Sequence, residues 1–399
     1  MFEMLFRSEP SGENPAVPLS ELGSDSWLCN GAVSENTALS LSAVYACIAV
    51  LGRSMGQLPL HVMRKVDGEV KRATDHPAYY LLHDEPNQWQ TSYDWRETSM
   101  FHLGGWGNSY SYIKRSRKGE IQGLEFLKPN ESNLIKASSG RYIYQVNNDD
   151  LGQIGINPFD MLHFKAIGSD SKIGKSPIMQ CRESFALGLA AQNYGNKFFE
   201  GGGRPTSLVS AKTALNKESW GLLKEAWKTA KNALKRDDNT TLLLPAELEY
   251  KSLTIPPEDA QFLETRKFNR SEIAGIFNVP AHMINDLEKA TFSNISEQAI
   301  QFVRHTMIPW VVKYEQEINR KLFTKIERDA GYYVKFNLNG LLRGTPEERA
   351  GFYTKGIRDG WLSRNEVRDL EEMNRVDGLD NFILSADLIP KGTPTSDKK

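Results

Sequence analysis

The chain has 399 residues and a mass of 45.0 kDa, which exceeds the usual size of one hydrophobic core and predicts two or more modules. Its 40% hydrophobic and 25% charged residues exclude wholesale disorder. Because the formal net charge is −1, any attraction to nucleic acid must come from local patches.

The cysteines and the apolar runs bear on the compartment. The three cysteines, Cys29, Cys47 and Cys181, lie far apart and form no CxxC pair. That spacing favours a reduced, cytosolic setting over a disulfide framework or a cysteine zinc site. No apolar run reaches the roughly 18 residues that span a membrane, and residues 1–6 lack the basic flank of a secretory signal. We therefore expect a protein that is cytosolic when made and has no membrane partner.

The first 174 residues predict an α+β domain. Residues 1–36 are rich in Ser, Gly, Pro and Asn and predict an extended arm, which an apolar helix follows at about 40–55. Alternating apolar residues on both sides of the polar turn 117–120 predict a β-hairpin. Further short strands are expected at 60–63, 142–146 and 161–164.

The pattern changes at Ser176, which predicts an N-cap with Pro177 in the first turn of a helix. This helix is expected to end at Gly201. The next predicted elements are a strand at 207–210, a helix at about 216–236, strands at 241–244 and 248–253, and a helix from Pro256-Pro257 to about 278.

After a loop to residue 293, Asn294 and Glu297 predict the capping-box start of a long helix over about 295–328. Pro309 lies inside this helix and should kink it. Two short helices are expected to begin after Thr345 and Ser363, and the chain to fray after about Lys391.

Enzymatic signatures are missing from the sequence. It has no GxxxxGK[ST] phosphate loop, no HExxH and no GxSxG. The glycine-rich residues 104–107 lead into a strand pattern, and we interpret them as a tight turn that packs against Trp106. Because no two histidines share a helix face, we expect His102 and His163 to be structural residues and not ligands. We predict no catalytic residues, no metal and no cofactor.

The predicted helix 216–236 carries an ordered row of basic side chains. At about 100° per residue, five lysines of the predicted helix 216–236 fall within a stripe about 60° wide, opposite an apolar face. They are Lys217, Lys224, Lys228, Lys231 and Lys235. The stripe could be a solvated helix surface, or it could contact a polyanion or an acidic partner. The helical geometry alone leaves both interpretations open.

Several segments carry a family resemblance. They are Gly107-Asn108-Ser109-Tyr110, Phe198-Phe199-Glu200-Gly201-Gly202 followed by Arg204-Pro205-Thr206, Asp259–Glu264 leading into Glu272–Pro280, Thr291–Asn294, and Ile308-Pro309-Trp310 before Glu315 and Leu322. In their joint order they resemble the portal proteins of long-tailed phages, and the resemblance covers most of the chain.

The resemblance implies a portal fold of named parts. They are an N-terminal arm (1–36), a wing (37–174 with the long helix and strand of 294–344), two stem helices (175–200 and 257–280), a small α/β clip (201–256), a tunnel loop (281–293), and a short helical crown with the C-terminal tail (345–399).

The resemblance also implies a structural function. The chain would form a dodecameric ring at one capsid vertex, a channel for packaging and ejecting double-stranded DNA that it binds without sequence specificity. Its partners would be the terminase large subunit, then head–tail adaptor proteins, with the major capsid protein and scaffold around it. ATP hydrolysis would belong to the terminase. The protein would belong to the virion, and to the host cytoplasm during assembly.

Two sets of site residues follow as hypotheses. The tunnel loop would place Asp286, Leu287, Glu288, Lys289, Ala290 and Thr291 at the channel, where the two carboxylates offset the one lysine. Of these, Leu287, Lys289 and Thr291 would touch the DNA backbone without recognising sequence. The lysine stripe would lie in the clip and dock the terminase or an adaptor.

Two other functions stay open at this point. One is another phage head or tail adaptor, although that class would not be expected to have this order of two stem helices and one long helix. The other is a DNA-processing phage enzyme such as a nuclease. That enzyme would need an acidic metal-binding cluster, which the sequence does not reveal.

Overall fold

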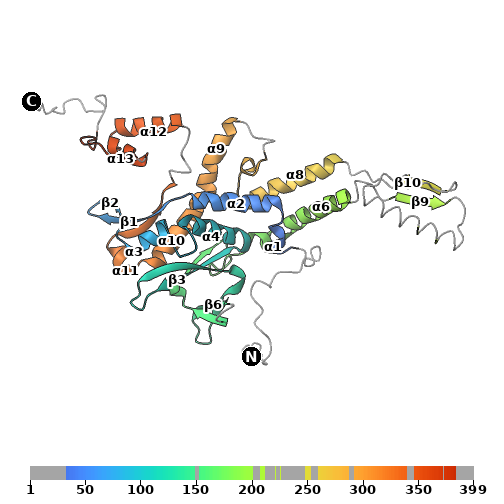
Figure 1. Ribbon diagram of the computed structural model, residues 1–399, viewed down its shortest axis with the longest axis horizontal. Coiled ribbons are helices and arrows are strands. Elements are labelled where there is room, and N and C mark those ends of the chain that lie inside the picture. The colour runs from blue at the N-terminus through green and yellow to red at the C-terminus, as the bar shows by residue number, and fades with distance from the viewer. Residues whose placement is uncertain are drawn as a thin grey trace, which may run out of the picture. The chain divides into compact units, whose positions relative to one another are not determined.

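The computed structural model describes residues 33–148, 152–200, 207–211, 221, 225, 248–252, 259–286, 292–338, 346–371 and 373–382 (Figure 1). The chain divides into two compact units. Unit 1 combines residues 1–47 with 176–277, and unit 2 combines residues 48–175 with 278–399. The first division falls inside helix α2 (Ser42–Gly56), close to the helix predicted at 40–55. The mixture of helices and strands agrees with the predicted α+β class.

Unit 1 is mainly helical in its described part. Its elements are α1 (Glu35–Ala38), α5 (Pro177–Gln180), α6 (Arg182–Glu200), α8 (Asp259–Ile276) and an antiparallel pair of strands, β9 (Ser207–Ala211) and β10 (Leu248–Ser252). The predicted N-cap is confirmed, because the Ser176 hydroxyl accepts a hydrogen bond from the Met179 N–H. The prediction of a single helix after this N-cap is wrong, because the helix is interrupted at Cys181 and α6 begins at the next residue.

The described part of unit 2 contains three antiparallel sheets. The first has the order β4-β3-β8, with β3 (Asn108–Arg115), β4 (Ile121–Leu127) and β8 (Met161–Lys165). The others are β11-β1-β2, with β1 (Leu60–Val66), β2 (Glu69–Arg72) and β11 (Tyr332–Phe336), and β5-β6-β7, with β5 (Ser132–Lys136), β6 (Tyr142–Asn148) and β7 (Gly152–Ile156). The predicted hairpin around residues 117–120 is confirmed as β3 and β4.

The glycine-rich residues 104–107 are not the tight turn expected from the sequence. They end helix α4 (Ser92–Trp106), which follows α3 (Pro77–His83), and neither helix was predicted. Only Gly107 turns the chain, as a left-handed C-cap with φ 72°. Gly104 is needed for packing instead, because a Cβ there would lie 2.8 Å from Cγ1 of Ile48.

Large side chains of α4, β8 and α10 form the core of unit 2. Tyr314 stacks on Phe164 with ring centroids 3.9 Å apart and donates a hydrogen bond of 2.6 Å to the Ser99 hydroxyl. The indole of Trp95 donates to the Ser111 hydroxyl at 3.2 Å. All five side chains are buried, and the hydroxyl and indole groups among them find hydrogen-bond partners within this core.

His163 is the structural histidine that the sequence predicted. One ring nitrogen lies 3.0 Å from the Tyr144 hydroxyl and the other lies 2.9 Å from Oδ1 of Asn108. Asn108 also accepts from the N–H of Gly174 at 2.7 Å and donates to its carbonyl. Burial holds the pKa of His163 well below its usual value, so the ring is neutral.

The long helix expected over 295–328 is three α-helices and a π-turn. Helix α9 (Phe292–Phe302) passes through a π-turn (Val303–Met307) into α10 (Ile308–Leu322), and α11 (Lys325–Asp329) starts separately. The irregularity expected at Pro309 therefore takes the form of a π-turn just before it. The helix ends early because Thr324 and Glu327 form a capping box that starts α11.

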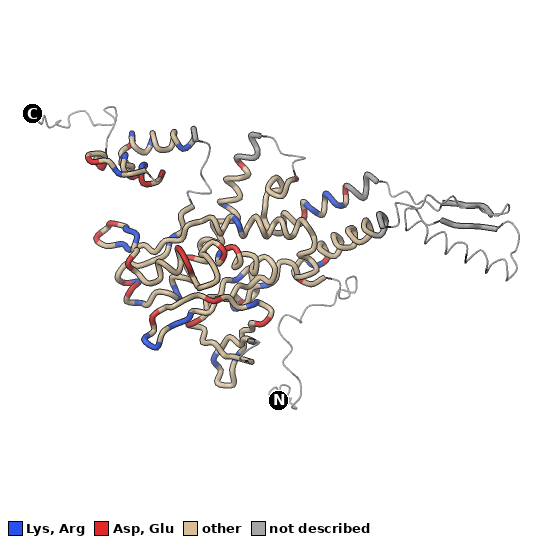
Figure 2. Tube along the Cα trace, in the orientation of Figure 1, with Lys and Arg blue, Asp and Glu red and all other residues tan. Residues whose placement is uncertain are grey.

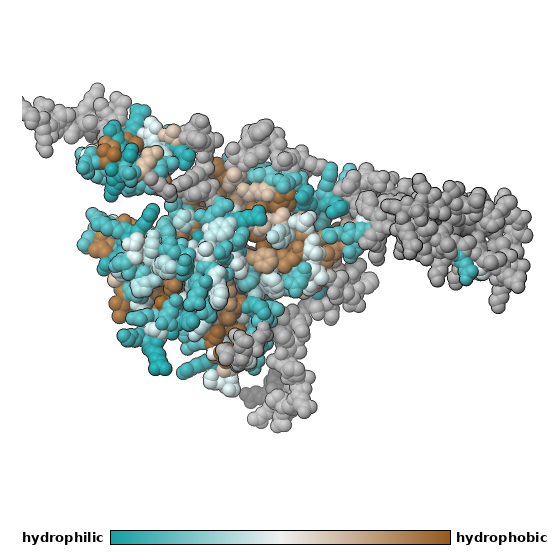
Figure 3. Space-filling model, viewed as in Figure 1, coloured by the Kyte–Doolittle hydropathy of each residue, from teal (hydrophilic) through white to brown (hydrophobic). Residues whose placement is uncertain are grey.

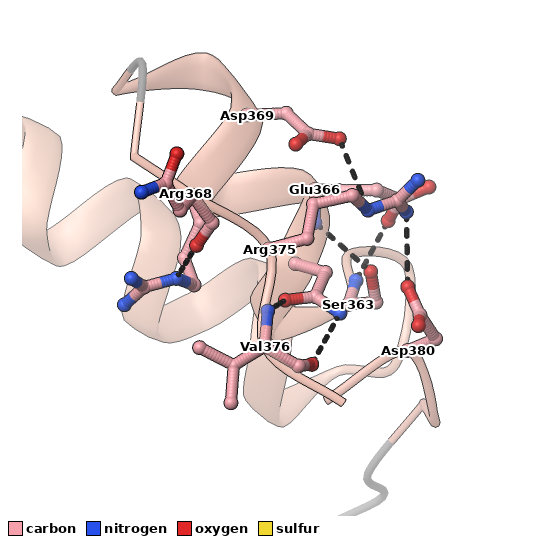
Figure 4. A network of polar contacts seen from close by, with 9 residues as sticks. Ser363, Glu366, Arg368, Asp369, Arg375, Val376 and Asp380 are labelled. Atoms are coloured by element: carbon pink, nitrogen blue, oxygen red, sulfur yellow. Dashed lines mark hydrogen bonds and ion pairs between the residues drawn. The ribbon is translucent and has the colours of Figure 1, made fainter. Parts of the chain in front are cut away.

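The C-terminal helices α12 (Pro346–Arg358) and α13 (Arg364–Leu370) begin near the predicted positions. Ser363 caps α13 through a capping box with Glu366 (Figure 4). The following chain returns to this helix, where Asn365 and the backbone of Val376 exchange two hydrogen bonds. Arg375 adds ion pairs to Asp369 and Asp380 (Figure 4).

Candidate functional site

Helices α6 and α8, which precede and follow residues 201–256, lie side by side in unit 1 (Figure 1). Asn269 is buried between them and donates to the backbone carbonyl of Ser184 at 2.9 Å. The Ser184 hydroxyl donates to Glu272 at 2.9 Å. Gly188 allows this close approach, because a Cβ there would lie 2.5 Å from Oδ1 of Asn269. The pairing of the two helices is therefore specific in register.

Charge is distributed unequally over this helix pair. Residues 184–196 of α6 contain no charged residue, whereas α8 carries Arg266, Lys267 and Arg270 together with Glu264 and Glu272 (Figure 2). These basic residues help to line a cavity of about 270 Å³ within unit 1, together with the start of α2. The cavity offers an electropositive wall that a neighbouring molecule could contact.

The same helices expose large apolar side chains. Leu187 and Tyr194 on α6 are 47% and 51% exposed, and Phe268 on α8 is 66% exposed. Leu187 and Tyr194 are seven residues apart, so they share one helix face. Apolar residues are visible at the surface of this part of the chain (Figure 3). A surface of this kind is typical of an interface with another protein.

Unit 1 also contains the two described cysteines. Both are free thiols, and Cys29 lies outside the described residues. Burial raises the pKa of the Cys47 thiol to about 12, although the nearby charge of Arg270 acts in the opposite direction. Cys47 is therefore a structural residue and not a reactive thiol.

The second candidate is the base of the predicted tunnel loop. Of the six residues assigned to it, only Asp286 is described; Leu287, Glu288, Lys289, Ala290 and Thr291 lie outside the described residues. Before the loop, a short 3₁₀ helix (Ala281–Ile284) ends at Asn285, which has φ 60°. The N–H of Asp286 then donates to the carbonyl of Ala281 at 3.0 Å. The chain leading into the loop is therefore locally ordered.

Two side-chain contacts join the two sides of this loop base. Nδ1 of His282 lies 2.7 Å from Oε1 of Gln298 on α9. Asn278 contacts Thr306 in the π-turn, with 2.9 Å between Nδ2 and Oγ1. None of these four side chains was predicted from the sequence as a site residue. A local signal existed for Asn278, because Asn just after a helix and before Val279-Pro280 is typical of a left-handed C-terminal position.

The lysine stripe of Lys217, Lys224, Lys228, Lys231 and Lys235 lies outside the described residues. Within 216–236 the structure describes Gly221 and Glu225, and both are helical and exposed. The stripe therefore stays a prediction.

The described residues also bear on other types of site. They contain no group of three or more His, Cys, Asp or Glu side chains arranged to hold a metal ion. In the same part of the chain, no helix has both the length and the apolar character needed to cross a membrane.

Comparison with known proteins gives a consistent family match. The family profile described as phage portal protein matches residues 42–372. The "Probable portal protein" of Streptomyces phage phiC31 is 31% identical over 361 residues, which cover 87% of this chain and 78% of that protein. The "Portal protein" of Enterobacteria phage HK97 is 26% identical over 389 residues, which cover 96% of this chain and 89% of that protein.

Solved structures share the fold. An HK97-family phage portal protein from Corynebacterium diphtheriae matches with a TM-score of 0.59 and 16% identity, covering 79% of this chain and 98% of that chain. A chain in the neck of a native gene transfer agent particle, computed with C12 symmetry, matches with a TM-score of 0.55 and 20% identity, covering 88% and 98% of the two chains.

Proposed function

The chain belongs to the phage portal protein family, and from that premise we propose that twelve copies form a ring at one capsid vertex, around a channel for double-stranded DNA. As a family member it is a structural component of the virion portal vertex and not an enzyme. The observation that best supports the proposed ring is the side-by-side pairing of α6 and α8, which leaves Leu187, Tyr194 and Phe268 exposed.

Simple geometry supports a channel of suitable width. Twelve helices spaced about 9–10 Å apart form a circle roughly 34–38 Å across. Subtracting one helix diameter of about 10 Å leaves an opening of roughly 24–28 Å, which would admit a DNA duplex. The C12 symmetry belongs to the gene transfer agent neck, and its similar fold makes the same number reasonable for this chain.

We assign the parts of the ring from the family pattern. The wing would comprise 37–174 and 294–344, the stem 175–200 and 257–280, the clip 201–256, the tunnel loop 281–293 and the crown 345–399, after an arm of 1–36. The assignment of the stem is supported by α6 and α8, which match its two segments closely.

The channel surface must hold DNA centrally without binding it tightly. Each phosphate contact makes DNA affinity fall with salt at a slope near −0.9, and a ring multiplies every lysine that faces the channel. Asp286 and Glu288 beside Lys289 would keep the local field mild. We expect Leu287, Lys289 and Thr291 to contact the DNA backbone without sequence recognition.

The lysine stripe would serve as the docking surface of the clip. A row of ammonium groups complements an acidic surface and steers its association. The partners we propose are the terminase large subunit during packaging and head–tail adaptors afterwards, while the major capsid protein and scaffold surround the ring. Reversing Lys224, Lys228 and Lys231 together to Glu should weaken terminase binding while the ring stays intact. Unchanged binding at low salt would favour a merely solvated helix.

Electron microscopy of the purified full-length chain, viewed down the ring axis, tests the central proposal. We expect rings with a central opening and a mass of hundreds of kilodaltons by light scattering. A monodisperse monomer at high protein concentration would contradict the proposal.

The channel loop has its own test. Rings with Lys289→Glu should assemble normally but package or retain DNA less well, because each copy then adds a negative charge at the DNA backbone. Normal packaging and retention would show that Lys289 does not face the DNA.

A further inference from the structure

Residues 287–291 are preceded and followed by described chain within unit 2. Residues 278–286 lead into this segment, and helix α9 with its π-turn leads away from it. Asn278 is the first residue of the leading chain and adopts a left-handed conformation with φ 52°. Asn tolerates this conformation better than most residues other than Gly.

Asn278 and Thr306 form reciprocal hydrogen bonds. The Thr306 hydroxyl donates to the backbone carbonyl of Asn278 at 2.6 Å. The Asn278 side-chain amide donates to the same hydroxyl oxygen at 2.9 Å. Thr306 is only 4% exposed, whereas Asn278 is exposed, so water competes little for the Thr306 hydroxyl although the pair as a whole is partly buried. The pair therefore holds the leading chain against the π-turn.

Pro309 explains why the backbone carbonyl of His305 is available to the Asn278 amide. Proline has no backbone N–H, so the carbonyl of His305 loses the donor that an α-helix would supply four residues later. The chain forms a π-turn, in which the N–H of Ile308 donates to the carbonyl of Val303. The Asn278 amide lies 3.4 Å from the His305 carbonyl and supplies a weak substitute donor. The contact of Asn278 thus uses an opening that Pro309 creates.

The contact between His282 and Gln298 lies closer to the loop along the chain. Together the two contacts fix the leading chain at residues 278 and 282 to the departing helix at residues 306 and 298. The segment 287–291 is thus joined at both ends to chain whose separation is set.

We propose that Asn278 and Thr306 are positioning residues, which together clamp the base of the loop 281–293 and set where its DNA-contacting residues stand. The role in the channel rests on the proposed function, whereas the clamp itself does not. A ring without the clamp would hold the same loop residues at a less defined radius, and DNA would be restrained less well.

Hydrogen exchange of the full-length protein tests the clamp. Asn278→Gly keeps the left-handed backbone accessible and removes the amide, and Thr306→Val removes the hydroxyl at nearly constant shape. In either variant, exchange in peptides covering 278–286 and 303–309 should speed up together by about fivefold or more, the ratio expected for lost intramolecular hydrogen bonds. Thr306→Ser keeps the hydroxyl and should retain most of the protection.

Ser99→Ala is the matched control, because it also removes a buried hydroxyl in unit 2 that accepts a hydrogen bond from Tyr314. It should lower global stability without selectively exposing the two loop-base peptides. Unchanged exchange in both clamp variants, or equal acceleration in Ser99→Ala, would overturn the clamp.

DNA retention in filled particles tests the positioning role. Asn278→Gly and Thr306→Val particles should lose DNA faster than unaltered and Ser99→Ala particles when all assemble equally. Faster exchange with normal DNA retention would mean that the clamp exists but does not position the loop, and the proposal would fail. If the unaltered chain forms no ring, the proposed function fails while the exchange result still decides the clamp.

Discussion

The core of unit 2 and the helix pair of unit 1 differ in whether their side chains find contacts within the same unit. In unit 2, the buried polar side chains of Asn108, His163 and Tyr314 find partners inside the same unit. In unit 1, Leu187 and Phe268 stay exposed although α6 and α8 pair closely. A self-contained core stabilises the single chain, whereas an exposed apolar helix surface gains its stabilisation from a neighbour.

This difference predicts whether a mutation should change the stability of the chain or its assembly. Changes in the core of unit 2 should appear as lost stability of the chain, and changes on the outer face of the unit 1 helices should appear as lost assembly.

The largest loss of stability is expected for Trp95→Ala. Trp95 is fully buried and its indole contacts the Ser111 hydroxyl, so the substitution removes apolar contacts, opens a cavity and leaves a polar group unpartnered. We expect a loss of about 3–5 kcal/mol in the free energy of unfolding, measured by urea denaturation. Trp89 is 88% exposed, and Trp89→Ala should have little effect. Equal effects of the two substitutions would refute the packing argument.

Asn108→Ala should follow. This substitution strands the N–H and carbonyl of Gly174 and one nitrogen of His163 in a buried site. Each stranded group costs about 1–3 kcal/mol, so the free energy of unfolding should fall by at least about 2 kcal/mol. Asn133 is exposed on β5, and Asn133→Ala serves as the control. A stability within error of the control would mean that the network contributes nothing net.

Acidification should destabilise unit 2 more than unit 1. Burial lowers the pKa of His61 and His102 to about 4, whereas an unfolded histidine has a pKa near 6.5. Between these values the unfolded chain binds more protons, so stability is complete above about pH 6.5 and is lost as pH falls toward about 4. All seven histidines lie in unit 2 and none in unit 1. Unit 2 should therefore lose histidine-linked stability selectively.

Hydrogen exchange of peptides from each unit, corrected for intrinsic rates, measures this difference between pH 7 and pH 5. His102→Phe should flatten the pH dependence of unit 2, because His102 packs among aromatic rings and its buried Nδ1 has no hydrogen-bond partner among the described residues. A pH dependence unchanged by this substitution would assign the effect to carboxylates or other groups.

The smallest effect on the free energy of unfolding is expected for Phe268→Ser. An exposed side chain contributes within about 0.5 kcal/mol to the stability of one chain. The same change should nevertheless shift the protein from rings toward smaller species, measured by analytical ultracentrifugation. Ile326→Ser removes an apolar side chain that is 81% exposed on α11 and should leave assembly unchanged. If the Phe268→Ser protein still forms intact rings, Phe268 does not contribute to the interface between copies.

Features encoded within a few neighbouring residues could be predicted from the sequence. The N-cap at Ser176, the hairpin of β3 and β4 and the start of α13 at Ser363 all appear as expected. Each depends on side chains and backbone groups close together in the chain, so local preference decides the outcome. The family resemblance rests on such local segments in a fixed order, and the family match confirms it.

Tertiary structure decided the features whose partners are distant in sequence. Asn108 meets Gly174 across 66 residues, and the Asn278 amide meets Thr306 across 28. Position 104 of helix α4 requires glycine because Ile48 occupies the space that a Cβ would take, which composition alone cannot reveal. The π-turn likewise depends on two separated causes, the missing N–H of Pro309 and the donor that Asn278 brings to it. Local sequence limits which conformations a segment can adopt, whereas packing between distant segments selects among them because only that packing determines which buried groups find partners.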